Sequence, residues 1–343
     1  MFLTEANLLH YLLEKRFTDL ETIVHGAYAV RPLTRRNRNF RVICGARSYL
    51  VKQVKKWDAD GQESLAREAA IYWLCKTDSR FAPLAALVPE SYAWDPAHSI
   101  LILEFLPEYT ELYDLPDRFA PELARLAGGA MGSFHREMAG EEMGALVAGE
   151  APSYLSLHEA EDDEMASHGL GRLELVRLVK KHPEFGTALD RLREEWREDT
   201  LVHGDWKIEN CLVSDDRQQI RVIDWELAGY GDACWDVATM LQSYWSFWVR
   251  WPSSYSMEEI RPAVHAFLEA YAEARECDVS EVRARAIRFM GARLLQTAFE
   301  ALDGRDAMTA EAVRLAQASL NILTRPEWAE EQLLGVRSEC ATS

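Results

Sequence analysis

The chain has 343 residues, of which 48% are hydrophobic and 27% are charged, and its formal net charge is −18. This length suffices for two domains, or for one two-lobed domain with a substantial core. The acidic balance argues against nucleic acid as a partner, because binding phosphates requires clustered Lys and Arg, and no apolar run is long enough to span a bilayer. An acidic surface also favours a cationic partner, although it more often serves solubility.

The first third of the chain predicts a small β-rich region. Leucines at helical spacing indicate an amphipathic helix over residues 5–17. Short β-branched or aromatic runs separated by turn segments then predict an antiparallel meander. These runs cover residues 27–30, 40–43 and 48–52. A helix is expected at about 63–76, and the apolar run 100–106, closed by Pro107, is typical of a buried strand.

The remainder of the chain predicts mainly helices. Residues 121–138 carry their apolar side chains on one helical face. Further helices are expected at about 171–182, 185–198, 233–248, 258–275, 280–302 and 308–323. Residues 211–213 and 220–223 are the only strands predicted in this half.

These elements predict an α+β protein with two lobes and a ligand bound between them. The small antiparallel β-rich N-lobe is expected at 1–106, the larger helical C-lobe at 107–330, and a loosely held tail at 331–343. The six cysteines are scattered without a C-x-x-C spacing, which favours free thiols over disulfides or metal ligands. The N-terminal residues do not have the pattern of a signal peptide, so we expect a cytoplasmic protein.

Two short segments of the helical half carry oxygen-bearing side chains at a specific spacing. The first is His203-Gly204-Asp205-Trp206-Lys207-Ile208-Glu209-Asn210, and the second is Ile223-Asp224-Trp225-Glu226. Phosphoryl transfer from a magnesium nucleotide needs a carboxylate to position the acceptor hydroxyl. It also needs an amide oxygen and a second carboxylate to hold the metal on the phosphates. The pattern therefore predicts a kinase-type phosphotransferase.

These segments, with Gly231-Asp232 and Trp235-Asp236 downstream, resemble the aminoglycoside phosphotransferase and choline kinase-like family, whose fold is protein kinase-like. The resemblance implies that Asp205 is the catalytic aspartate, which orients the acceptor hydroxyl and takes its proton. Asn210 and Asp224 would be ligands of Mg²⁺. His203 would brace the loop, and Asp236 would accept hydrogen bonds from the loop backbone.

The resemblance also implies residues that bind ATP. Lys52 matches the strand lysine that grips the phosphates, and Glu68 matches its partner on a helix. Alternation along the strand places Lys52 on the same face as Leu50, pointing inward. The alternative is an exposed basic run formed with Lys55 and Lys56. The segment from Glu104 to Leu106 resembles the hinge, where backbone groups would pair with adenine.

Two features concern charge beside the phosphates. The loop 33–41 contains no glycine, so its backbone cannot approach phosphate closely. Arg35, Arg36 or Arg38 would supply positive charge there by side chain, or they would meet solvent. Lys207 occupies a position where Ser/Thr protein kinases carry a lysine. There it would neutralise charge on the transferring phosphoryl group, unless it is an exposed lysine on a turn.

The acceptor class is left with two candidates. The resemblance implies the hydroxyl of a small amino-containing molecule, whereas Lys207 fits a Ser or Thr of a precursor peptide in a lanthipeptide-like natural-product pathway. Two segments are candidates for acceptor binding: the acidic residues Glu159, Glu161, Asp162, Asp163 and Glu164, and the aromatic-rich stretch 244–251. Each has a plainer interpretation, as a solvated loop and as core packing respectively. A nucleotide-binding pseudokinase scaffold is the remaining alternative, and the presence of the Asp205, Asn210 and Asp224 side chains argues against it.

Overall fold

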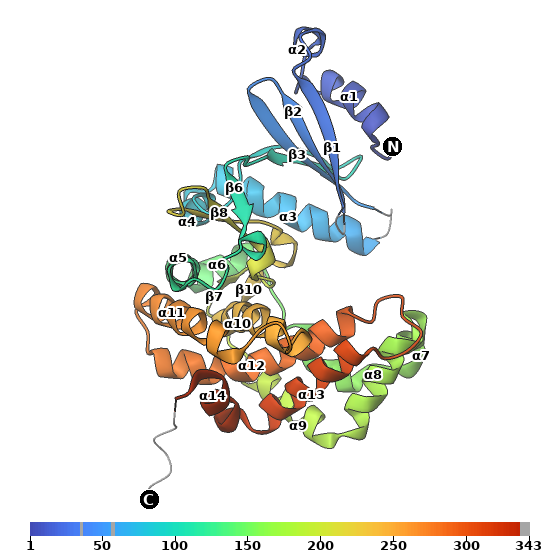
Figure 1. The fold of residues 1–343 in the computed structure, drawn as a ribbon. Helices are drawn as coiled ribbons and strands as arrows, with labels where there is room; N and C mark the ends of the chain where they lie inside the picture. The colour runs from blue at the N-terminus through green and yellow to red at the C-terminus, as the bar shows by residue number, and fades with distance from the viewer. Residues whose placement is uncertain (35–36, 56–58, 337–343) are drawn as a thin grey trace, which may run out of the picture. The chain divides into compact units, whose positions relative to one another are not determined.

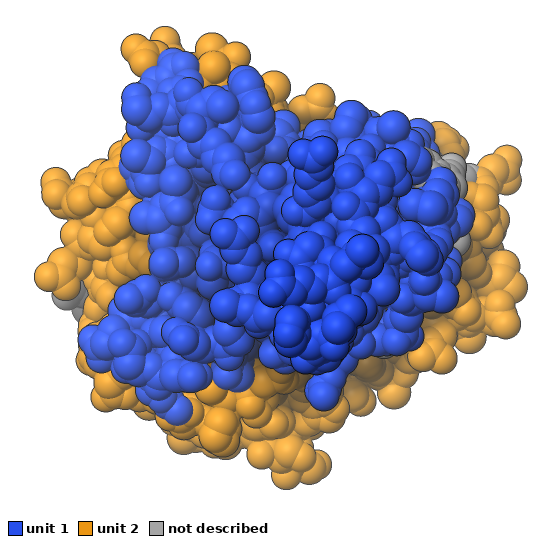
Figure 2. Space-filling view, turned by 90° about the horizontal axis from the view of Figure 1, so that it is seen from above, with its two compact units in different colours: residues 1–111, 212–228 blue, residues 112–211, 229–343 orange. Residues whose placement is uncertain are grey.

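A computed structural model describes residues 1–34, 37–55 and 59–336. Contacts within the chain group it into two compact units, shown in Figures 1 and 2. Unit 1 comprises Met1–Glu111 and Leu212–Ala228, and unit 2 comprises Leu112–Cys211 and the chain from Gly229 onward. Unit 1 includes residues 212–228, which the sequence analysis assigned to the C-lobe. The domain boundaries at residues 106 and 330 stay predictions. Four residues discussed above lie outside the described part, namely Arg35, Arg36, Lys56 and Cys340.

Unit 1 is built on a five-stranded antiparallel sheet with the strand order β1-β2-β3-β5-β4. Its strands are β1 (Tyr28–Thr34), β2 (Arg38–Cys44), β3 (Arg47–Gln53), β4 (Ser91–Asp95) and β5 (Ile100–Glu104). The predicted meander and the predicted buried strand are confirmed. Strand β4 was not predicted, because its five residues are all half-buried and show no alternation of apolar and polar side chains.

The two faces of this sheet have different partners. Alternate residues of β2 and β3, such as Phe40 and Val51, are buried in a cluster with Leu8 and Leu12 of α1 (Glu5–Glu14). Successive side chains of a strand point to opposite faces of the sheet. Lys52 follows Val51 directly and therefore lies on the face opposite to Val51. That opposite face is the one from which Lys52 reaches α3 (Ala59–Thr77), as described below.

Unit 1 also contains a three-stranded sheet, ordered β6-β8-β9. Its strands are β6 (Tyr109–Glu111), β8 (Cys211–Ser214) and β9 (Ile220–Val222), and two short helices, α2 (Leu20–Val24) and α4 (Ala82–Ala85), complete the unit. Strands β8 and β9 confirm the two predicted in the second half of the chain. The expectation that they are the only strands there is wrong, because β6, β7 (Thr200–Val202) and β10 (Gly229–Gly231) are also present. Each of these three has only three residues, too few for a periodic pattern to be recognised.

Unit 2 is mainly helical, and the two-stranded pair β7-β10 is its sheet. The seven predicted helices correspond to α5 (Pro121–Glu137), α8 (Leu170–Lys181), α9 (Pro183–Glu194), α10 (Ala233–Arg250), α11 (Met257–Arg275), α12 (Val279–Glu300) and α13 (Ala310–Thr324). Three further helices are α6 (Glu141–Leu146), α7 (Asp162–Ser167) and α14 (Pro326–Leu334). Helix α14 extends into the predicted tail, and α7 covers part of the acidic segment that was interpreted as a loop.

Helices α5 and α11 pack closely because glycines lie where they meet. A Cβ on Gly128 would lie 2.3 Å from the carbonyl oxygen of Phe267, and one on Gly132 would lie 2.4 Å from that of Tyr271. Figure 1 shows the two helices side by side. The absence of a side chain at these two positions therefore sets the distance between α5 and α11.

The N-terminus of α10 is fixed by a buried ion pair. Asp232 is the N-cap residue of the helix and accepts a hydrogen bond from the N–H of Cys234 at 2.9 Å. Its other oxygen accepts from Arg285 of α12 at 2.5 Å, and both side chains are buried. Because Trp235 and Asp236 follow in the first turn, this pair also positions two residues of the site described below.

The described cysteines are free thiols: Cys44, Cys211 and Cys234 are buried, Cys75 is half-buried and Cys277 is exposed. None of the helices within 1–34, 37–55 and 59–336 combines the length and apolar character that crossing a membrane requires.

Candidate active site

The loop between β7 and β8 carries the first predicted motif. It begins at His203, directly after β7, and ends in a single 3-10 turn, Ile208–Asn210. Gly204 has φ +81°, in the left-handed region that L side chains avoid. The glycine of the His-Gly-Asp sequence is therefore explained by backbone conformation, since it lets the chain turn sharply immediately before Asp205.

The backbone of this loop is held by the first turn of α10. Asp236, fully buried, accepts hydrogen bonds from the N–H groups of His203 at 2.7 Å and Gly204 at 2.9 Å. The indole N–H of Trp235 donates to the carbonyl oxygen of Gly204 at 3.0 Å. Within the loop, Nδ1 of His203 accepts from the N–H of Asp205 at 3.1 Å. Asp236 and His203 thus make the contacts that their predicted supporting roles require.

The carboxylate of Asp205 lies between two cations. Its Oδ2 is 2.7 Å from Nζ of Lys207, and its Oδ1 accepts from Arg293 of α12 at 2.7 Å. Burial raises the pKa of Asp205, but the positive charges of Lys207 and Arg293 outweigh burial, so the pKa lies below its ordinary value. Asp205 is therefore an ionised hydrogen-bond acceptor at neutral pH. It is 19% exposed, so part of the carboxylate is open to solvent.

Lys207 and Asn210 are both oriented by Asp205. Burial lowers the pKa of Lys207, but Asp205 raises it by more, so this lysine stays charged. At 31% exposure Lys207 is not a fully exposed turn residue. The amide nitrogen of Asn210 donates to the carbonyl oxygen of Asp205 at 2.9 Å. This assignment leaves the amide oxygen of Asn210 as the atom with which a cation would be bound.

A second set of predicted residues comes together within unit 1. Nζ of Lys52, which is only 3% exposed, lies 2.6 Å from Oε2 of Glu68 on α3 and 2.5 Å from Oδ1 of Asp224. Burial lowers the pKa of Lys52, but Asp224 and Glu68 raise it by more, and the ammonium stays charged. Burial raises the pKa of Glu68 more strongly than Lys52 lowers it. Lys52 is thus paired and buried, and does not belong to an exposed basic run.

Asp224 has a backbone conformation that is uncommon for its residue type, with φ 65° and ψ 55°. The turn is held on one side by Trp225, whose indole N–H donates to the carbonyl oxygen of Val222 at 2.9 Å. On the other side, Glu226 accepts a hydrogen bond from Ser64 of α3. Asp224 is 36% exposed, so its carboxylate can serve Lys52 and also remain accessible. Strained conformations of this kind occur often at functional sites.

Each unit offers an oxygen donor of the kind that Mg²⁺ prefers. In unit 1 it is the carboxylate of Asp224, and in unit 2 it is the amide oxygen of Asn210.

The remaining predicted nucleotide-binding residues have local partners. The guanidinium of Arg38 lies over the ring of Phe2 at 4.9 Å and donates to the carbonyl oxygen of Leu3 at 3.5 Å. Glu104 ends β5, where its carboxylate accepts from the N–H of Glu90 at 3.2 Å. Leu106 follows and is half-buried. The nucleotide-binding roles of Arg38, Glu104 and Leu106 stay predictions.

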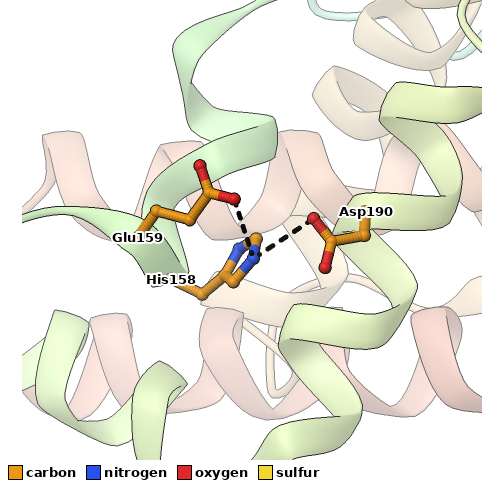
Figure 3. Close-up of side chains that lie close together, drawn as sticks. All are labelled: His158, Glu159 and Asp190. Atoms are coloured by element: carbon orange, nitrogen blue, oxygen red, sulfur yellow. Dashed lines mark ion pairs between the residues drawn. The ribbon is translucent and has the colours of Figure 1, made fainter.

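A third cluster, in unit 2, has the geometry of a metal site but already contains a cation. Glu159 and Asp190 approach Nε2 of His158 at 3.8 and 3.3 Å, and Figure 3 shows both carboxylates turned toward the imidazole. Arg193 pairs with the same two acids, at 3.0 Å to Glu159 and 2.8 Å to Asp190. The guanidinium therefore supplies the positive charge that this acidic pair requires.

Arg293 is the residue of the site that sequence reasoning did not identify. It lies in the predicted helix 280–302, outside both motifs, and is 3% exposed. A weak signal was available, because Arg285 and Arg293 are eight positions apart and so fall on the same, largely apolar, face of the helix. Two arginines on a buried face indicate buried partners, but they do not say which partners.

Comparison with known proteins gives the class of the chain. The profile of the Phosphotransferase enzyme family matches residues 30–286, so the chain belongs to this family. It is an ATP-dependent phosphotransferase of the kinase class with an alcohol group as acceptor. A comparison with curated protein sequences finds no match.

Solved structures confirm the protein kinase-like fold. An ethanolamine kinase from Plasmodium vivax is similar with a TM-score of 0.64 and 14% identity, over 96% of this chain and 92% of that one. The choline kinase LicA from Streptococcus pneumoniae has a TM-score of 0.56 and 14% identity, over 93% and 98%. A thermostable mutant of an aminoglycoside phosphotransferase, in a ternary complex with ADP and hygromycin B, has a TM-score of 0.50 and 16% identity, over 91% and 98%.

Proposed function

We propose that this enzyme transfers the γ-phosphoryl group of ATP, with magnesium, to a hydroxyl of a small amino-containing molecule. One observation carries the proposal: the Asp205 carboxylate lies between two cations, with Lys207 2.7 Å from one oxygen and Arg293 2.7 Å from the other. An ionised carboxylate accepts a hydrogen bond from the acceptor hydroxyl and then its proton. A charged lysine beside it neutralises negative charge that develops on the phosphoryl group.

The reaction assigns a role to each set of residues. The acceptor oxygen attacks the γ-phosphorus, the bond from phosphorus to the bridging oxygen of ADP breaks, and the hydroxyl proton passes to Asp205 and then to solvent. Lys52, oriented by Glu68, binds the phosphates of ATP. Asn210 and Asp224 are each proposed as a ligand of magnesium, which would neutralise charge on those phosphates. Arg38 and the Glu104–Leu106 segment are proposed to bind the rest of the nucleotide.

Two observations support a small cationic acceptor. Similar structures are named as ethanolamine and choline kinases, whose substrates carry a hydroxyl beside an ammonium group. The net charge of −18 also favours a cation. Two acids of the acidic segment considered above as an acceptor site have partners of their own, since Glu159 pairs with Arg193 and Asp162 pairs with Arg177 and Lys180. These pairs weigh against that segment as the binding site of either acceptor class, an aminated small molecule or a basic peptide.

The test is phosphate transfer from radiolabelled ATP and Mg²⁺ to a panel of acceptors. The panel contains ethanolamine, choline, an aminoglycoside and a Ser/Thr-containing basic peptide, and products are identified by mass spectrometry. Asp205→Asn is the variant that should lose transfer. Asp215→Asn, an exposed aspartate on the hairpin between β8 and β9, makes the same chemical change away from the loop and should keep it.

We expect the wild type and Asp215→Asn to phosphorylate an amino-containing small molecule, and Asp205→Asn to be inactive. Transfer only to the peptide would replace the proposed acceptor class by a Ser/Thr peptide. Absence of transfer to every acceptor in the panel, or full activity of Asp205→Asn, would overturn the proposal.

A further inference from the structure

Arg293 is held on three sides in the interior of unit 2. One terminal nitrogen donates to Oδ1 of Asp205 at 2.7 Å, and the other donates to Oε1 of Gln296 at 2.6 Å. The guanidinium lies over the ring of Trp235, 5.2 Å from its centroid. Only 3% of the side chain is exposed. A planar guanidinium with these contacts has one orientation available to it.

The two oxygens of Asp205 consequently differ in how firmly they are bound. Oδ1 faces the buried, fixed guanidinium of Arg293. Oδ2 faces Lys207, which belongs to the same loop and is 31% exposed, and it is 3.4 Å from the amide nitrogen of Asn210. A flexible, partly solvated ammonium can move aside, whereas a guanidinium bound on three sides cannot. Oδ2 is therefore the oxygen that another hydrogen-bond donor can reach.

Arg293 and the loop backbone are also joined through Trp235. The indole N–H of Trp235 donates to Gly204 at 3.0 Å, and its ring supports the guanidinium. Asp236, the next residue, accepts hydrogen bonds from the N–H groups of His203 and Gly204. The first turn of α10 thus fixes the loop backbone, and α12 fixes the side chain that the loop carries.

We propose that Arg293 is a positioning residue for phosphoryl transfer: it holds Oδ1 of Asp205 so that Oδ2 is presented to the acceptor hydroxyl. The inference rests on the function proposed above. In the transfer step, the acceptor O–H donates to Oδ2 in place of the ammonium of Lys207, which turns to the phosphoryl group. The proton of the hydroxyl passes to Oδ2 as the oxygen–phosphorus bond forms, and Arg293 keeps all its protons throughout.

The test compares Arg293→Met and Arg293→Lys with the wild type, using the acceptor that the panel identifies. Arg293→Met should lower kcat about 100-fold, as expected when a catalytic group is displaced by about an ångström, and leave the KM for ATP unchanged. The kcat of Arg293→Lys should lie between those of the wild type and Arg293→Met, because one ammonium cannot bind Asp205 and Gln296 while also stacking on Trp235. Arg288→Met is the control, since Arg288 lies on the same helix and pairs with Glu195 at 2.6 Å.

The folded fraction of each variant is measured by circular dichroism below its melting transition, and kcat is divided by that fraction. A purely structural role would lower the folded fraction and leave kcat per folded molecule at the wild-type value, which would overturn the inference. If Arg293→Met does not fold, Arg293→Lys decides: reduced kcat with unchanged KM for ATP supports the inference, and wild-type kcat overturns it. An inert wild type instead overturns the proposed function, so the two failures are distinct.

Discussion

The two units hold their charged residues in opposite arrangements. In unit 1 one cation, Lys52, contacts two carboxylates, Glu68 and Asp224. In unit 2 one carboxylate, Asp205, contacts two cations, Lys207 and Arg293. The first set has a surplus of negative charge, and the second has a surplus of positive charge. The comparison shows that the same pairing of buried lysine or arginine with carboxylate gives the two units local charges of opposite sign.

The two sets are also supported differently. In unit 1 the charged side chains hold one another: Lys52 contacts Glu68 and Asp224, and the side chains of Lys52 and Glu68 are buried. Asp205 lies on a loop whose backbone is bound by Asp236 and Trp235. Losing a partner should therefore affect mainly the side chains in unit 1, and both the side chain and the backbone in unit 2.

The largest effects should come from removing one negative charge from each set. Asp205→Asn and Asp224→Asn should each lower kcat by about 1000-fold or more, since each removes a group that acts on charge or proton in the transition state. They should differ in stability. Asp205→Asn leaves Lys207 and the buried Arg293 without a counter-charge and should lose about 2 kcal/mol, whereas Asp224→Asn leaves Lys52 paired with Glu68.

Steady-state kinetics and urea unfolding of both variants measure this difference. Equal free energies of unfolding for Asp205→Asn and Asp224→Asn would contradict the expectation that only Asp205→Asn leaves a buried cation without a counter-charge. Retained turnover in either variant would contradict the role assigned to that residue.

Lys52→Met should produce the largest loss of stability in unit 1. Glu68 is fully buried and would lose its cation, at a cost of about 3–5 kcal/mol. Burial already raises the pKa of Glu68, and removing Lys52 raises it further. A carboxyl whose pKa is higher in the folded than in the unfolded protein binds more protons when folded, so folding becomes more favourable as pH falls. In urea titrations, the free energy of unfolding that Lys52→Met loses relative to the wild type should therefore be smaller at pH 5 than at pH 8. A loss that does not depend on pH would count against a buried, unpaired Glu68.

Asp236→Ala should destabilise the loop of unit 2 through its backbone. The substitution leaves the buried N–H of His203 and the N–H of Gly204 without an acceptor, and should cost about 3 kcal/mol. Thermal unfolding measures the cost, and Asp236→Asn, which keeps one acceptor oxygen, should recover part of it. An unchanged melting temperature for Asp236→Ala would contradict the supporting role.

A neighbouring pair of glycines gives the smallest expected effect, with its control in the same helix. A Cβ at Gly128 would lie 2.3 Å from the carbonyl oxygen of Phe267, so Gly128→Ala should destabilise unit 2 by about 1–3 kcal/mol. At Gly129 a Cβ would meet nothing within 4 Å, so Gly129→Ala should stabilise by about 0.5–1 kcal/mol through helix propensity. Denaturant titrations of both variants compare the two; changes of the same sign would contradict the close contact between α5 and α11.

Much of the fold and of the site follows from short-range sequence pattern. The seven long helices of unit 2 were predictable because apolar residues at helical spacing continue for several turns. The loop from His203 to Asn210 was predictable because its groups lie within one short segment. Three-residue strands such as β7 and β10 carry too little pattern, and they form because their partner strand supplies the hydrogen bonds.

The sequence motifs were enough to predict which groups carry the chemistry, whereas the charges around those groups depend on how the helices and strands pack. Lys52 and Glu68 are 16 positions apart, and the family resemblance implied their pairing, with strand alternation placing Lys52 on the inward face. Lys52 and Asp224 are 172 positions apart, and Asp205 and Arg293 are 88 positions apart. No local period connects residues at such separations, because their contact depends on how whole helices and strands pack. The charge surplus of each set is therefore a property of the folded chain.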